Sequence, residues 1–141
     1  MWNRTQRRAI RAGLAIVALP AALIAAWALL APRSFNDDFP GAGHEWVAPL
    51  GPYNEHLVRD VGAFQLGLLV LAVFAFVTLD RRVVQAAFLA FAVAALPHLI
   101  FHFTETEALT TLDNVVSLVG LALPLIVPLA LLPALRMRAP R

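Results

Sequence analysis

The sequence predicts an all-α integral membrane protein, a four-helix bundle with its N- and C-termini on the cytoplasmic side. Of the 141 residues, 60% are hydrophobic and only 14% are charged, and the mean hydropathy is +0.75. A soluble domain of this length has too little interior to hide so much apolar surface. The apolar residues also fall into four long runs, and the arginines are distributed unevenly among the connecting segments.

The four apolar runs predict four membrane spans within one domain, residues 1–141. The spans are residues 12–31, 61–79, 83–103 and 112–135. Each is close to the ~20 helical residues that cross the hydrocarbon core of a bilayer. The first run is long for a signal peptide and is followed by Pro32, so we expect an uncleaved anchor. Asn54 is the expected N-cap of the second helix.

Residues 32–53 are expected to form a long polar loop on the outer side. Proline and glycine are adjacent at Pro40-Gly41 and at Gly51-Pro52, which predicts turns. Aromatic residues such as Trp46 and Tyr53 suit the headgroup layer. A loop of this length without cysteine is either mobile or folded onto the bundle as a lid, and the sequence leaves both alternatives open.

Arginine counting predicts the orientation. Nine of the eleven basic residues lie in the N-terminal head, the Arg81-Arg82 turn and the C-terminal tail, whereas only Arg33 and Arg59 lie on the other side. By the positive-inside rule both termini are cytoplasmic. Every basic residue is arginine, and alanine, leucine, valine and proline are abundant, which is typical of GC-rich genomes. We therefore expect a bacterial plasma membrane protein, multi-pass, whose arginines set topology and do not bind nucleic acid.

Ionisable side chains gather at the outer ends of the predicted helices. His98 and His102 are four residues apart and share one helix face, and Glu105 continues that stripe. The second helix brings His56 and Asp60 to the same depth. Ionisable groups within apolar sequence are costly, so they usually face a bundle interior or a wet cavity. Since imidazole and carboxylate bind transition metals, we predict that these five residues form a metal site for Zn, Cu or Fe.

Further polar residues lie at the same end of the predicted bundle. The fourth span begins there with Asp113, Asn114 and Ser117. The outer loop contributes Asp37, Asp38, His44 and Glu45. All four histidines of the protein therefore belong to its outer half.

The sequence also permits alternatives to the metal site. The H-x-x-x-H spacing lacks the glutamate of a zincin protease, and a haem held by His56 and a histidine of the third span is the weaker cofactor hypothesis. The same residues can instead hydrogen-bond between helices without a ligand. The leading prediction is a metal-binding membrane protein that is an enzyme or a redox component. The alternative is a non-catalytic accessory or assembly subunit, and no catalytic residue, substrate or metal identity is predicted.

Two segments carry a family resemblance. They are Pro52-Tyr53-Asn54-Glu55-His56-Leu57-Val58-Arg59-Asp60 and Pro97-His98-Leu99-Ile100-Phe101-His102. Both resemble segments of small four-span membrane proteins of high-GC bacteria, and the broad architecture is similar to that of DoxX-like proteins. The resemblance implies a four-helix membrane fold, but no activity and no functional residues. The expected partners are the lipid bilayer and either a second copy or another subunit of a membrane complex.

Overall fold

Four long helices form the body of the molecule. The computed structural model describes residues 2–135, and the long helices are α1 (Arg4–Leu30), α3 (Glu55–Thr78), α4 (Arg81–Thr104) and α5 (Thr111–Leu135). In that part of the chain, four helices are long and apolar enough to cross a membrane. The prediction of an all-α fold with four helices of spanning length is therefore confirmed.

Side-chain caps explain where the helices begin. α1 starts at Arg4, eight residues before the predicted span, because Asn3 and Gln6 form a reciprocal capping box with bonds of 2.8 and 3.1 Å. Asn54 caps α3 as predicted and accepts from the Leu57 amide at 3.2 Å. Asp80 caps α4, because its Oδ1 atom accepts from the backbone amides of Arg82 and Val83. Capped starts let the helices extend beyond the apolar runs.

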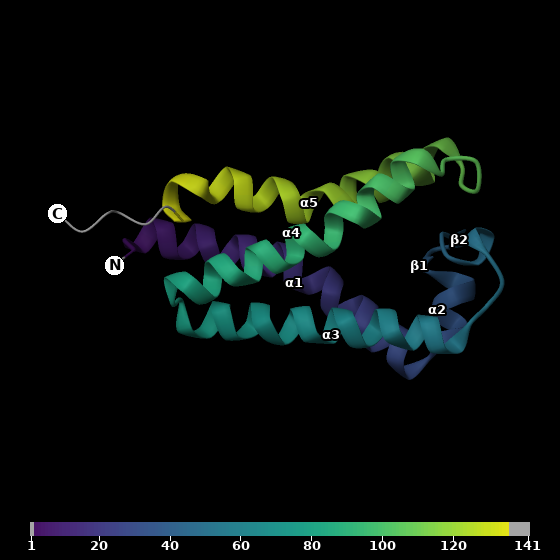
Figure 1. Cartoon of the computed structure of the whole chain (residues 1–141), viewed down its shortest axis with the longest axis horizontal. Helices are drawn as coiled ribbons and strands as arrows, with labels where there is room; N and C mark the ends of the chain where they lie inside the picture. Colours follow the sequence, from purple (N-terminus) through teal and green to yellow (C-terminus); the bar gives the residue numbers. More distant parts are fainter. Residues whose placement is uncertain (1, 136–141) are drawn as a thin grey trace.

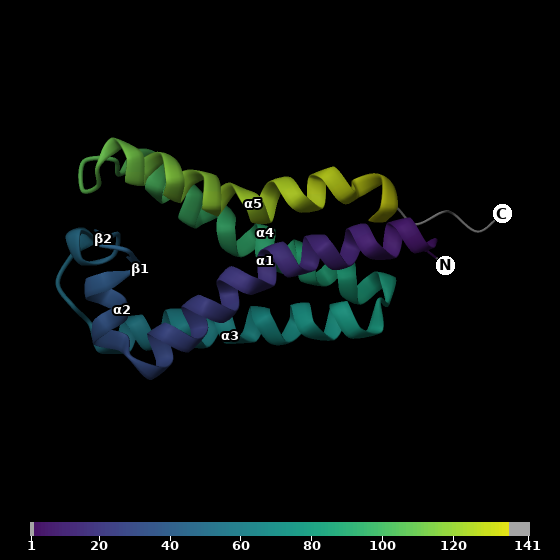
Figure 2. The ribbon, with the colours of Figure 1, turned by 180° about the vertical axis from the view of Figure 1, so that it is seen from behind.

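The helices form two pairs that diverge. The start of α1, the α3–α4 turn and the end of α5 lie together, and we call this the terminal end; the other connections lie at the opposite, loop end (Figure 1). α1 packs along α3, and α4 packs along α5. Figures 1 and 2 both show α3 and α4 joined at the terminal end and separating towards the loop end.

The main core lies toward the terminal end. Its largest fully buried side chains are Ile10, Leu14, Val84 and Phe88, which come from α1 and α4. A second, smaller core near the loop end includes Ala28 and Val58.

The segment between α1 and α3, predicted as a long polar loop, contains short regular elements. It contains α2 (Pro32–Asp38), a hairpin of β1 (Pro40–Gly41) and β2 (His44–Glu45), and the short helix η1 (Ala48–Leu50). Proline at the first helical position favours an immediate restart of the helix after Ala31. Within α2, Arg33 Nε donates to Asp37 Oδ2 four residues later at 2.7 Å, which stabilises this short helix.

Aromatic contacts join this loop to α1. Trp27 of α1 meets the rings of Phe35 and Phe39 edge-on, each with centroids 6.1 Å apart. Phe39 in turn meets Trp46, just after β2, at 5.9 Å. Of the two arrangements that the sequence left open, the structure has the one in which the loop packs onto the helices.

Candidate functional site

The histidine pair of α4 lies as the sequence spacing predicts. The Nε2 atoms of His98 and His102 are 3.1 Å apart, and their ring centroids are separated by 4.9 Å. His102 is buried, with 6% of its surface exposed, whereas His98 is exposed. The pair therefore joins a buried imidazole to an accessible one.

The tautomer of His102 follows from its surroundings. Its Nδ1 atom is buried and has no hydrogen-bond partner among the described residues. An unpaired N–H in this position costs about 1–3 kcal/mol, and neutral imidazole carries only one N–H. In a metal-free pair, the proton of His102 is therefore best placed on Nε2, which donates to Nε2 of His98.

A second cluster joins the loop between α1 and α3 to the start of α5. The Asp113 carboxylate accepts from Trp46 Nε1 at 2.8 Å and lies 2.7 Å from His44 Nδ1, both through Oδ1. Its Oδ2 atom accepts from the Thr110 hydroxyl at 2.6 Å. We call these four residues the Asp113 cluster. Because Asp113 is only 8% exposed, its carboxylate is held by protein donors instead of bulk water.

Thr110 shows why α5 begins where it does. Its hydroxyl oxygen accepts from the Asp113 amide at 3.2 Å while its proton is donated back to the Asp113 carboxylate. This reciprocal arrangement resembles a capping box. The Thr110-x-x-Asp113 spacing is therefore the sequence signal that identifies Asp113 as an N-terminal anchor. Nothing in that spacing predicts the further bonds from His44 and Trp46.

Asn114 fastens the connection between α4 and α5, and Ser117 in turn bonds to Asn114 within α5. The Asn114 amide nitrogen donates to the backbone oxygens of Thr106 at 2.8 Å and Leu109 at 3.1 Å. Ser117 donates to the Asn114 carbonyl at 3.0 Å. Asn114 and Ser117 are both buried. The Oδ1 atom of Asn114 is a further buried atom without a hydrogen-bond partner in the described part of the chain.

The remaining predicted ligands lie elsewhere. His56 and Asp60 face each other on α3, with Nε2 and Oδ2 3.4 Å apart and side chains 87% and 46% exposed. Glu105 ends α4 and is exposed. The structure thus brings His98 to His102 and His56 to Asp60 as two separate local pairs. Across residues 2–135, no three His, Cys, Asp or Glu side chains lie together so that they could hold one metal ion.

Arg33 and Asp37 of the loop between α1 and α3 make contacts within α2 and with the segment that follows it. Hydrogen bonds from Asn36 and Arg33 hold the pKa of Asp37 below its ordinary value. The Arg33 guanidinium also lies over the Tyr53 ring, 4.8 Å from its centroid. Desolvation, followed by the nearby charge of Glu55, raises the pKa of Tyr53. These contacts fix α2 against the segment that leads into α3.

Comparisons with known proteins do not add to this geometry. No protein-family model, curated protein or solved structure matches the chain. The function must therefore be argued from the histidine pair, the Asp113 cluster and the four apolar helices.

Proposed function

We propose that the chain is a multi-pass membrane protein that binds a transition-metal ion at its loop end, with His98 and His102 as two of the ligands. The 3.1 Å separation of their Nε2 atoms carries this proposal. A metal 2.0–2.1 Å from each nitrogen would subtend an N–metal–N angle of about 100° at that separation. This angle lies between the octahedral and tetrahedral ideals, so two imidazoles so placed can share one ion.

The other coordination positions would be filled from outside this pair. Water, a substrate or a second copy of the chain can supply them, and Zn, Cu and Fe all accept imidazole. An open position on the metal would permit activation of water or redox chemistry, which is the basis for an enzyme or redox role. Divergence of α3 from α4 at the loop end counts against a haem held between His56 and α4, because the two axial ligands must face each other.

We also propose the orientation of the molecule. The nine-to-two arginine distribution places the terminal end in the cytoplasm and the loop end outside a bacterial plasma membrane. Reporter fusions after residue 141 and within the loop at residue 45 should then report opposite compartments. A common compartment for both reporters would contradict the four-span topology.

A second candidate function is that of an accessory or assembly subunit of a membrane complex. It is favoured by the buried, unpartnered Nδ1 atom of His102. Metal bound at Nε2 would force the proton of His102 onto Nδ1, where a ligating histidine normally needs an acceptor. A metal-free hydrogen bond to His98 avoids this buried N–H. In this alternative the polar residues only stabilise the fold that partners recognise.

Metal analysis of single variants separates the two candidates. The protein should be purified with a histidine-free affinity tag and its metal content measured at pH 7.5 and below pH ~6.5, where protonated imidazole releases metal. Metal ligation predicts stoichiometric metal in the wild type and its loss in His98→Gln and His102→Gln. His56→Gln is the matched control and should keep the metal, because His56 belongs to a different pair.

The outcomes are distinct. Metal that persists in both α4 variants would place the ligands elsewhere and refute this pair as the site. A wild type that holds no metal after growth with Zn, Cu or Fe supplements would favour the accessory role. In that case the Gln variants should cost only about 1 kcal/mol of stability, since glutamine still donates and accepts hydrogen bonds.

A further inference from the structure

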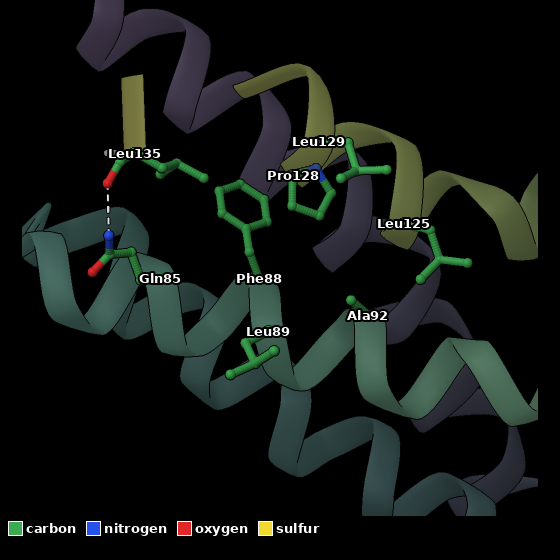
Figure 3. Close-up of a pocket in the computed structure, with 8 residues that line it drawn as sticks. All are labelled: Gln85, Phe88, Leu89, Ala92, Leu125, Pro128, Leu129 and Leu135. Carbon is green, nitrogen blue, oxygen red and sulfur yellow. Dashed lines mark hydrogen bonds between the residues drawn. The ribbon is translucent and has the colours of Figure 1, made fainter. Parts of the chain in front are cut away.

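An apolar groove lies between α4 and α5, away from the histidines. Its volume is about 430 Å³, within the range of small-molecule sites. α4 contributes Gln85, Phe88, Leu89 and Ala92, and α5 contributes Pro128 and Leu129 among others (Figure 3). Leu89 and Leu129 are 65% and 63% exposed. The groove is therefore open sideways, where a spanning protein meets lipid.

A polar contact closes the groove at the terminal end. The Gln85 side chain donates to the Leu135 carbonyl at 2.6 Å, across the space between the two helices (Figure 3). The last carbonyls of a helix lack intrahelical partners, and in an apolar environment such groups need one. Gln85 therefore connects the end of α5 to the first turns of α4, and the apolar groove begins beyond this contact.

A basic residue precedes Gln85 on α4. Arg82 precedes Gln85 by three residues and Leu89 by seven, so these positions follow one another along the same side of α4. Arg82 is exposed. A basic side chain at the cytoplasmic edge of an apolar groove matches the phosphate of an anionic lipid, whose acyl chain then lies in the groove.

We propose that this groove is a binding site for one anionic phospholipid, with an acyl chain against Phe88, Ala92 and Pro128 and the headgroup phosphate contacted by Arg82. The proposal rests on membrane insertion with the terminal end in the cytoplasm. It does not depend on metal binding at the loop end. The occupant is distinguished from bulk lipid by retention through purification and by preference for a negative headgroup.

Native mass spectrometry of the protein released from lipid nanodiscs tests the site. The nanodiscs should contain equal amounts of phosphatidylglycerol and phosphatidylcholine of the same chain length. The wild type should retain one phospholipid per chain, mostly phosphatidylglycerol. Ala92→Phe fills the groove and should remove the retained lipid. Ala94→Phe is the matched control, because position 94 is exposed and does not line the groove.

The headgroup contact is tested separately. Arg82→Gln should keep a bound lipid but lower the preference for phosphatidylglycerol about fivefold, the effect of one basic residue near a membrane surface. Arg8→Gln removes the same charge from α1 at the terminal end and should leave the preference unchanged. Equal lipid retention by Ala92→Phe and Ala94→Phe would overturn the proposal. So would an unchanged headgroup preference in Arg82→Gln, which remains decisive if Ala92→Phe fails to fold.

Discussion

Removal of the Asp113 carboxylate should release the β1–β2 hairpin from α5. The Asp113 carboxylate links the two, because its Oδ1 atom accepts from Trp46 Nε1 at 2.8 Å and lies 2.7 Å from His44 Nδ1. Hydrogen bonds to a charged acceptor contribute about 1.5–3 kcal/mol each. The His44 side chain is 45% exposed, so water replaces part of its contribution. We therefore expect Asp113→Ala to lower the free energy of hairpin opening by ~2–4 kcal/mol.

Limited proteolysis can measure this opening. A glutamate-specific protease cuts after Glu45, which is exposed but held in β2. When opening is fast relative to cleavage, the rate follows the open population, so ~2–4 kcal/mol corresponds to a ~30- to ~1000-fold faster cut. Exposed Glu55, in the first turn of α3, is an internal reference within the same digest, because it lies outside the hairpin and the α4–α5 connection.

Two controls keep the interpretation specific. Asp38→Ala removes a carboxylate from the same loop, but Asp38 bonds Ser34 within α2 and should leave Glu45 protected. Trp46→Phe keeps a ring against Phe39 while removing the donor, so its acceleration should be smaller than that of Asp113→Ala. Cleavage after Glu45 at the wild-type rate in Asp113→Ala would refute the argument, because the aromatic contacts would then hold the hairpin alone.

Two further predictions concern packing and pH. A Cβ at Gly62 would lie 2.8 Å from Leu29 Cγ, so Gly62→Ala should push α1 away from α3. We expect the free energy of unfolding, measured by thermal unfolding in detergent, to fall by about 1–3 kcal/mol. Gly67→Ala is the control and should not destabilise the protein, because a Cβ there meets nothing within 4 Å. Because the folded-state pKa of Asp37 is lowered, its ionised form stabilises α2 above the ordinary pKa of 3.8, and that contribution is lost as pH falls through the lowered value. Amide exchange in residues 32–38 should therefore accelerate on acidification in the wild type and depend less on pH in Asp37→Asn.

Features that depend on nearby residues could be predicted from the sequence. Hydropathy and length identify the four long helices, because spanning length is a local property of each apolar run. Helix geometry over three or four residues is enough to predict the cap at Asn54. It also predicts that His98 and His102 lie on one face. The predicted span 12–31 leaves the start of α1 open, and the capping box of Asn3 extends the helix through polar residues to Arg4.

Contacts between distant segments could not be predicted in the same way. Trp46 and Asp113 are 67 positions apart, and no periodicity relates a hairpin residue to a helix start. Hydropathy also contains no information on the angle between neighbouring spans. The predicted five-residue pocket assumed that α3 and α4 stay close at the loop end, as His56 and His98 would require. The divergence of the two helix pairs is the reason that the structure instead places these residues in separate local pairs.

The first turns of α5 connect separate segments of the loop end, whereas the hydrogen bond between His98 and His102 stays within α4. Asp113 binds the hairpin, while its neighbour Asn114 binds the backbone of the α4–α5 connection at Thr106 and Leu109. That connection leaves α4 directly after the turn that holds His102. Displacement of residues 113–114 would therefore loosen the hairpin and the end of α4 together. Loss of protection at Glu45 and a change in the environment of His102 should accordingly appear in the same variants, whichever ligand or partner the loop end binds.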